Sequence, residues 1–480
     1  MAGGLVIRGS AVRVAGYVIN VAFGVLAAAF LIRHLGVADY GTFVAVTSLV
    51  TVVAAISDAG LGTIALREYA VRPVAERDSF LKNLLGMRLL LTIAGIGSIA
   101  AVLAVAQGER IPALGFTLLG IGLVLTVVQH NYAIPLAAHL RLGAVTVLEI
   151  VRTIGMTGLV LGFVAAGFGL NAFFATPIPV GVVVLVLTAM VIRGSVPLTA
   201  GFQLRDAWSL LRDALVFTAA SSLGVVYYRI AIVLLSLIAT KEETGYFGAS
   251  FRVIETLTVI PVLLVSTAFP VLSRAALDDK DRFRYATHRL FDIALIAGVW
   301  FALSTAIAAA PAIELIAGSE FSPSVPVLQI QAVSLLATFL AGASGYALLA
   351  LRRHAALLVV NALALGLAVT LTLILARSHG AKGAAVAMTV AEFALVAFQL
   401  LALVRYRREL RPPLAFLPRV ALAAGAAGSM AFVPGLPALA ALAASTFVFF
   451  ALLFALRAVP PEVLDALRGR TPPDARGLKD

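Results

Sequence analysis

Long apolar runs separated by short polar segments extend over most of the chain, from residue 11 to residue 456. An α-helix of about 20 apolar residues is long enough to cross the roughly 30 Å hydrocarbon core of a bilayer. Fourteen runs come close to or exceed this length. They lie near residues 11–32, 41–65, 84–106, 111–137, 145–167, 172–192, 214–238, 245–272, 290–317, 325–350, 355–376, 381–404, 414–434 and 437–456. The pattern predicts an all-α polytopic membrane protein with about 14 transmembrane helices.

Two segments need a separate interpretation. The run 11–32 follows Arg8 and Arg13 and ends in three alanines, as a signal peptide would, but it is long and a second span follows at once. We therefore interpret it as the first transmembrane helix. Residues 203–215 have apolar positions at helical spacing and charges on the other side. This pattern predicts an amphipathic helix on the cytoplasmic membrane surface.

Composition agrees with a membrane protein and excludes several classes. Hydrophobic residues make up 61% of the chain and charged residues 12%, and the mean hydropathy is +1.04. Such values exclude a soluble globular protein. The sequence has no Cys, its six His form no H-E-x-x-H pair, and it has no phosphate-binding G-x-x-x-x-G-K-[ST] loop. We predict no cofactor, and we expect any energy input to come from an ion gradient, the substrate gradient or another chain.

The basic residues predict the orientation in the membrane. They occur in short blocks between apolar runs rather than on one polar face, so we predict no nucleic-acid partner. With the N-terminus in the cytoplasm, 27 of the 36 Lys and Arg lie inside and five lie outside, namely Arg33, Arg110, Lys241, Arg377 and Lys382. Because cytoplasmic loops carry an excess of Lys and Arg, both termini are predicted to be cytoplasmic.

An internal repeat predicts two lobes. The segment "GTFVAV" at Gly41 matches "GYFGAS" at Gly245 at an offset of 204 residues, Arg141 aligns with Arg353 at 212, and "GFGLNAFFAT" aligns with "GAKGAAVAMT" at 213. We predict an N-lobe of six helices (1–200), a C-lobe with the interfacial helix and six more (201–405), and two further helices with a tail (406–480). Six is even, so the two lobes are expected to be parallel, with substrate between them.

Three segments resemble a known family. They are "LIRHLGVADYGTFVAVTSLVTVVAAISDAGL", "YYRIAIVLLSL" with the following "ETGYFGASFRVIETLTVIPVLLVSTAFPVLSR", and "GAKGAAVAMTVAEF". They resemble the polysaccharide-biosynthesis flippases of the multidrug, oligosaccharidyl-lipid and polysaccharide exporter superfamily. The resemblance implies two six-helix lobes around a cavity, alternating access, the bacterial cytoplasmic membrane, and a polyprenyl-pyrophosphate-linked glycan as cargo. Polysaccharide assembly proteins are further candidate partners.

One position departs from the family pattern. Many relatives resemble Tyr-x-Arg-x-Asp in the seventh span, whereas here Tyr227, Tyr228, Arg229 and Ile230 are followed by Ala231. If that carboxylate serves ion coupling in relatives, this chain lacks it.

Arg229 is the most informative intramembrane charge. It lies about ten residues, or roughly 15 Å, from the outer end of its span. A lipid-facing Arg costs at least about 2.5 kcal/mol, so we expect Arg229 to face the bundle interior or water. Thr218 and Ser222 share its helical face. A guanidinium presents a planar set of donors that suits a pyrophosphate.

Other polar residues share helical faces in the same way. Arg13 aligns with Asn20, Asp58 with Thr47 and Thr51, and Arg252 with Glu255, while Gln129 begins a polar cluster ahead of Pro135. The candidate substrate-binding residues are Arg229, Arg13, Arg252, Asn20, Ser222 and Gln129. The candidates for ion coupling are Asp58, Glu255 and Glu392.

Structural roles remain open for most of these residues. Arg252 with Glu255, and Glu149 with Arg152, are spaced to neutralise each other locally, and small or hydroxylated residues commonly pack membrane helices together. Arg229 either binds cargo or pairs with Asp58 or Glu392. The alternative function is a cation-coupled multidrug exporter of the same superfamily. A membrane glycosyltransferase or polymerase is disfavoured, because the chain has no large outer loop and no D-x-D motif.

Overall fold

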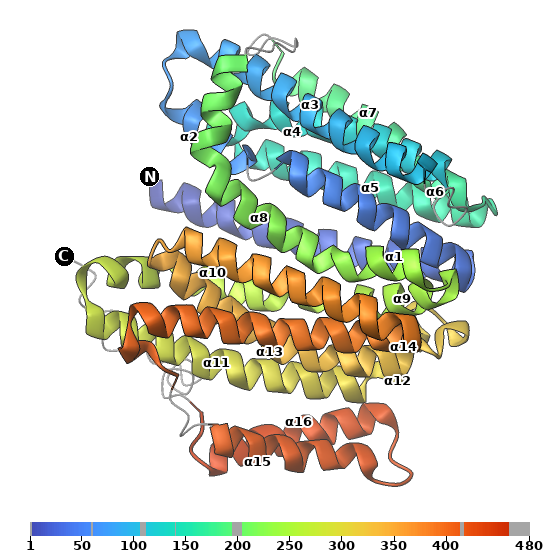
Figure 1. The fold of residues 1–480 in the computed structure, drawn as a ribbon, viewed down its shortest axis with the longest axis vertical. Helices are drawn as coiled ribbons and strands as arrows, with labels where there is room; N and C mark the ends of the chain where they lie inside the picture. Colours follow the sequence, from blue (N-terminus) through green and yellow to red (C-terminus); the bar gives the residue numbers. More distant parts are fainter. Residues whose placement is uncertain are drawn as a thin grey trace. The chain divides into compact units, whose positions relative to one another are not determined.

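The computed structural model describes residues 2–58, 61–105, 112–139, 141–193, 204–412 and 417–459. Within these ranges the chain is helical apart from turns and short connections (Figure 1). The α-helices are α1 (Ala2–Asp58), α2 (Leu61–Val71), α3 (Val74–Val105), α4 (Ala113–Ala138), α5 (Leu142–Ala165), α6 (Leu170–Ala175), α7 (Pro177–Val191), α8 (Leu204–Ile238), α9 (Lys241–Leu257), α10 (Val259–Asp278), α11 (Lys280–Ile307), α12 (Ala309–Ile316), α13 (Ser324–Ala350), α14 (His354–Tyr406), α15 (Leu417–Gly428) and α16 (Ala438–Ala455). Short 3-10 turns are η1 (Ser319–Phe321), η2 (Arg408–Leu410) and η4 (Ser429–Phe432).

The number of spans agrees with the prediction of an all-α polytopic membrane protein. In the described ranges, ten helical segments are long and apolar enough to cross a membrane. Two of them, in α1 and α14, each contain two helices joined at a glycine with positive φ, Gly36 (φ 67°) and Gly380 (φ 53°). The left-handed region is accessible to glycine at little cost, so these positions allow the chain to reverse. The shorter apolar helices Ser222–Ile238 and Leu417–Phe432 bring the spans in this part of the chain to fourteen.

Proline explains two interruptions that the predicted boundaries did not include. The predicted span 290–317 is divided between α11 and α12, and Pro311 lies in the first turn of α12. Helix α9 ends at Leu257, four residues before Pro261 in α10. In both places the ring would clash with the carbonyl four residues earlier and has no N–H to donate.

The predicted interfacial helix is not separate. Residues 204–215 form the first turns of α8, which continues without a break to Ile238. The predicted span 41–65 also differs, because α1 ends at Asp58 and α2 begins at Leu61.

Packing divides the chain into two units. The first unit comprises Met1–Ala249, Glu314–Phe321 and Leu365–Ala384, and the second comprises Ser250–Ile313, Ser322–Ala364 and Ala385–Asp480. These units reflect contact density and do not coincide with the lobes inferred from the repeat. The lobe boundaries at residues 200 and 405 therefore stay predictions.

In the first unit, α1 lies beside α5 and α8, while α4 lies against α3 and α7 (Figure 1). Phe116 of α4 and Phe174 of α6 are fully buried among aliphatic residues of α1 and α8. Phe43 of α1 stacks on Phe174 with ring centroids 5.6 Å apart. This apolar core holds α8, and therefore Arg229, against α1.

In the second unit, α10, α11 and α13 pack around Phe283, Phe291 and Phe339. Helices α15 and α16 pair with each other and contact α11. Trp300 of α11 donates its indole N–H to Thr446 of α16 at 3.3 Å.

The repeated glycines have a structural reason within the first unit. A Cβ atom at Gly41 of α1 would overlap the carbonyl oxygen of Lys241, and one at Gly245 of α9 would overlap that of Val37. The two helix beginnings are therefore in backbone contact, which only glycine permits. The contact is reciprocal, and it joins two positions that the repeat makes equivalent.

Candidate functional site

Arg229 lies on α8, in the part of the helix that packs against α1. Its side chain is half-buried, and the neighbouring Tyr227, Ala231 and Ile232 are buried. Two turns earlier on the same face, Ser222 donates a hydrogen bond to the carbonyl oxygen of Ala55 at 2.9 Å. Because its side chain is half-buried, Arg229 does not face only lipid.

Two other candidate residues, Asn20 and Arg13, belong to the first half of α1. The carboxamide oxygen of Asn20 is buried and has no hydrogen-bond partner among the described residues. The side chain of Arg13, like that of Thr218 on α8, lies outside the part of the chain whose side chains are described.

Asp58 forms an ion pair with Arg88 of α3, which lies inside the predicted span 84–106 although the charge count places it with the cytoplasmic cations. The Arg88 side chain is only 2% exposed, whereas that of Asp58 is 49% exposed. Among the described residues, Arg88 Nε and Nη1 have no hydrogen-bond partner. The signal was present, because Leu84, Leu85 and Met87 precede Arg88 and three leucines follow it, which is unusual for a loop cation.

Gln129 of α4 has a structural partner in the first unit. Its side-chain oxygen accepts a hydrogen bond from Arg152 of α5 at 2.6 Å, and its side-chain nitrogen lies 3.4 Å from the Thr188 hydroxyl of α7. Arg152 also donates to the Thr126 hydroxyl at 3.5 Å. Gln129 is 5% exposed, so this network joins three helices in the interior.

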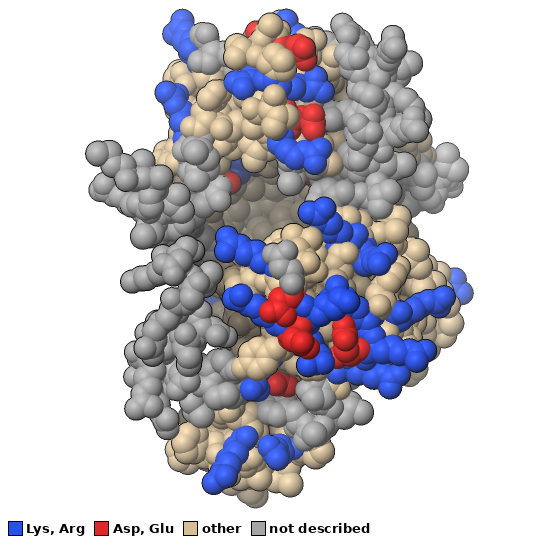
Figure 2. All heavy atoms as spheres, turned by 90° about the vertical axis from the view of Figure 1, so that its left-hand side faces the viewer, with Lys and Arg blue, Asp and Glu red and all other residues tan. Residues whose placement is uncertain are grey.

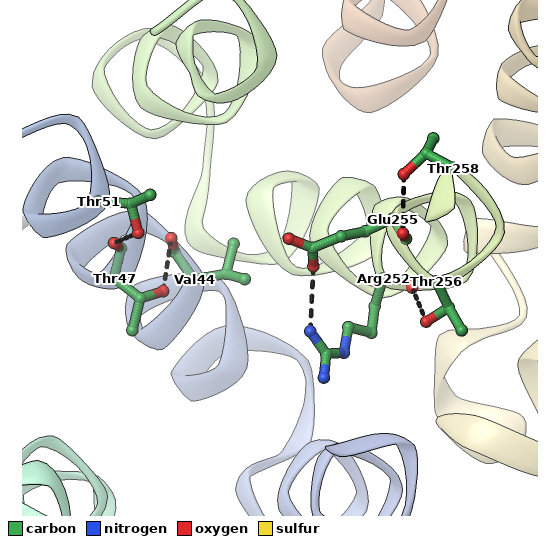
Figure 3. A network of polar contacts seen from close by, with 7 residues as sticks. All are labelled: Val44, Thr47, Thr51, Arg252, Glu255, Thr256 and Thr258. Atoms are coloured by element: carbon green, nitrogen blue, oxygen red, sulfur yellow. Dashed lines mark hydrogen bonds and ion pairs between the residues drawn. The ribbon is translucent and has the colours of Figure 1, made fainter. Parts of the chain in front are cut away.

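Arg252 and Glu255 form the local pair that their spacing suggested. Arg252 Nη1 lies 3.0 Å from Glu255 Oε2 on α9, as Figure 3 shows. On the same segment, the hydroxyls of Thr256 and Thr258 donate to backbone carbonyls at 3.0 and 2.8 Å (Figure 3). Glu392 of α14 also belongs to the second unit and is 4% exposed.

The predicted hydroxyl stripe on α1 is satisfied within its own helix. Thr47 donates to the Phe43 carbonyl at 2.8 Å. Figure 3 shows its second bond, to the Val44 carbonyl at 3.1 Å, and the bond from Thr51 to the Thr47 carbonyl at 2.7 Å. Such bonds are common for Ser and Thr in membrane helices and support a packing role for this stripe.

Within the described ranges, the candidate residues fall into two groups. Arg229, Ser222, Asn20, Gln129 and Asp58 belong to the first unit, and Arg252, Glu255 and Glu392 belong to the second. In the part of the chain with described side chains, no three His, Asp or Glu residues gather as a metal site would require.

The sequence of the chain matches one known protein family. The profile of the family described as "Polysaccharide biosynthesis protein" matches residues 30–326, which is more than half of the chain. This chain belongs to that family. No curated protein sequence matches it at a significant level.

Solved structures show the fold. The lipid II flippase MurJ, in an inward closed conformation, is 12% identical, with a TM-score of 0.76 over 94% of this chain and 99% of that one. An inward-facing multidrug resistance transporter of the MATE family is 16% identical, with a TM-score of 0.63 over 80% of this chain and 94% of the other. A transporter of the same superfamily from Pyrococcus furiosus is 17% identical, with a TM-score of 0.54 over 84% and 96%. The chain is thus a multi-pass membrane protein of the polysaccharide biosynthesis family with the fold of these proteins.

Proposed function

We propose that this protein is a flippase that moves a polyprenyl-pyrophosphate-linked oligosaccharide across the bacterial cytoplasmic membrane by alternating access. The observation that carries the proposal is the match to the polysaccharide biosynthesis family over residues 30–326. The fold of a lipid II flippase over nearly the whole chain supports it, because that protein also moves a lipid across a membrane.

Arg229 is the residue that we assign to the cargo headgroup. Its half-buried side chain lies well inside the seventh span, where a permanent positive charge is costly unless it meets water or an anion. A pyrophosphate is a fixed anion at physiological pH, and a guanidinium binds phosphate oxygens through paired hydrogen bonds. We assign supporting roles to Arg13, Arg252, Asn20, Ser222 and Gln129. Three of these, Gln129, Arg252 and Ser222, also hold protein partners.

Alternating access requires an end of the bundle that closes and opens, and the first unit contains a closed end. At this end, the start of the second helix of α1 contacts the start of α9 through Gly41 and Gly245. Beside them, Arg33 donates to the carbonyls of Glu314 and Leu315 at 2.9 and 2.7 Å. Glu243 accepts a hydrogen bond from the backbone N–H of Ala381. All these contacts join segments that we predict to face outward, so breaking them is our proposed route for cargo release.

The test uses the natural cargo. A strain without this gene should accumulate a lipid-linked glycan on the cytoplasmic leaflet, and that glycan, once extracted, is the probe for transfer in vesicles containing the purified protein. Transfer that depends on the protein supports the flippase. Absence of any accumulated lipid-linked glycan, or equal transfer in protein-free vesicles, would refute it.

A cation-coupled multidrug exporter remains the alternative, supported by the fold shared with MATE transporters. Two of the three carboxylates it would use already face arginines, Asp58 with Arg88 and Glu255 with Arg252. These ion pairs would have to open before either carboxylate could bind a coupling ion. The exporter predicts that cells expressing the protein extrude cationic dyes when a proton or sodium gradient is present, whereas the flippase predicts no such extrusion.

A further inference from the structure

A basic pocket lies in the second unit, and its lining includes none of the residues assigned to cargo. It has a volume of about 180 Å³ and is lined by Ala276, Leu277, Ala350, Leu351, Arg352, Arg353, Tyr406 and Arg407. These residues belong to the C-terminal ends of α10, α13 and α14 and to the turn that precedes α14. The pocket is therefore at helix ends, where a membrane protein meets lipid headgroups, on the side that we predict to be cytoplasmic.

Arg352 occupies a backbone position that normally favours glycine. Helix α13 ends with two reversed hydrogen bonds, from Arg352 N–H to the Leu349 carbonyl at 2.9 Å and from Arg353 N–H to the Leu348 carbonyl at 3.0 Å. This is the Schellman ending, in which the residue after the cap takes a left-handed conformation, and Arg352 has φ 56°. Helix α5 ends in the same pattern with Gly167 at this position (φ 70°). Glycine can take this left-handed conformation at little cost, so the backbone at this position would accept glycine in place of Arg352.

Two of the three guanidinium groups of the pocket lie near aromatic rings. Arg353 lies 4.0 Å from the ring centroid of Tyr406, and Arg407 lies 5.5 Å from that of Phe283. Among the described residues, no carboxylate forms an ion pair with any of the three arginines. Arg407 Nη1 is buried without a hydrogen-bond partner in this part of the chain. A buried charged donor of this kind needs an acceptor.

Exposed apolar side chains beside the pocket suit contact with the acyl chains of a lipid. Leu277 at its edge is 69% exposed, and Leu401 of α14 lies exposed less than two turns before Tyr406. Figure 2 shows a dense group of Lys and Arg on one face of the protein, with a smaller cluster of Asp and Glu among them. We infer that the pocket formed by Arg352, Arg353 and Arg407 binds the phosphate of an anionic phospholipid headgroup. Basic pockets between transmembrane helices on the cytoplasmic side are known to bind such headgroups.

The test measures lipid retention by the full-length protein. The protein, purified in detergent, is titrated with phosphatidylglycerol, with phosphatidylcholine, or with inorganic phosphate, and bound lipid is counted by native mass spectrometry. The informative variant is Arg352→Gly, because glycine relieves the left-handed strain and preserves the fold. Its matched control is Arg457→Gly, since Arg457 (φ 51°) occupies the same position after α16 and does not line the pocket. Arg407→Gln is a second pocket variant that leaves the backbone of α13 unchanged.

We expect the wild-type protein to retain phosphatidylglycerol in preference to phosphatidylcholine. Arg352→Gly and Arg407→Gln should each weaken phosphatidylglycerol binding about fivefold, and Arg457→Gly should not. Equal retention by the pocket variants and the control would overturn the inference. Displacement of phosphatidylglycerol by inorganic phosphate at equal concentration would also overturn it, and would assign the pocket to a soluble phosphate. Neither result depends on transport, so failure here leaves the proposed flippase activity untouched.

Discussion

At the scale of single residues, Arg229 is the position on which the proposed transport depends most. Removing a charged hydrogen-bond donor from a bound phosphate costs about 1.5–3 kcal/mol. We therefore expect Arg229→Ala to lower the rate of headgroup transfer in vesicles about 10- to 100-fold, with normal amounts of folded protein. Arg229→Lys should retain part of the activity, because lysine keeps the charge but not the planar fork.

The matched control is Arg419→Ala, which removes an arginine from the exposed surface of α15. It should transfer the headgroup at the wild-type rate. Unchanged transfer by Arg229→Ala would show that this arginine has a structural role instead.

The Asp58–Arg88 pair permits a second prediction about single residues. Asp58→Ala leaves Arg88 buried and without its carboxylate. The free energy of unfolding should fall by about 2 kcal/mol, less than the roughly 3–5 kcal/mol of a fully buried pair because the Asp58 side is half exposed. Thermal unfolding in detergent measures the loss, and the double variant Asp58→Leu with Arg88→Met should recover most of it. Normal stability of Asp58→Asn together with loss of transport would instead indicate that Asp58 carries an ion.

These residues also show what the sequence can and cannot predict. Helical periodicity predicts which side chains share a face, and so it anticipated the pair of Arg252 with Glu255 on one helix. It does not predict which neighbouring helix that face meets. For that reason the sequence does not reveal that Gln129 meets Arg152, or that Arg88, inside the predicted span 84–106, pairs with Asp58. Both contacts join two different helices.

At the scale of the elements, the contact between α1 and α9 predicts the effect of one methyl group. Gly41→Ala would place a carbon atom on the Lys241 carbonyl, so the two backbones must separate. We expect this variant to hold the outward end open and to stop transfer. Gly97→Ala is the control, since a Cβ atom there meets nothing within 4 Å.

Accessibility can report the opening directly, because the chain has no cysteine of its own. A single Lys241→Cys should react faster with a membrane-impermeant maleimide when Gly41→Ala is also present. Equal rates with Gly41→Ala and Gly97→Ala would contradict the closing role of this contact.

Elements were predicted more completely than contacts, for physical reasons. A transmembrane helix satisfies its own backbone hydrogen bonds and needs an apolar exterior, so length and hydropathy alone identify it. The reversals at Gly36 and Gly380 fall between predicted spans for the same reason. Breaks inside a span, such as those near Pro261 and Pro311, depend on local backbone geometry that hydropathy does not contain.

At the scale of the whole molecule, the sequence repeat and the packed units divide the chain at different places. The repeat pairs Gly41 with Gly245, and the structure brings these two positions together within one packed unit. That unit also holds Glu314–Phe321 and Leu365–Ala384, which the repeat assigns to the C-lobe. A closed end built from both sequence halves is what an alternating-access protein needs, because the same segments must separate when that end opens.

The orientation of the chain is the last prediction. Fourteen spans would place both termini on the same side, and the distribution of Lys and Arg predicts that this side is cytoplasmic. A green fluorescent protein fused after Asp480 should fluoresce, and alkaline phosphatase at that position should be inactive. Phosphatase inserted after Arg110, between the third and fourth predicted spans, should be active. Active phosphatase after Asp480, or inactive phosphatase after Arg110, would contradict the predicted orientation.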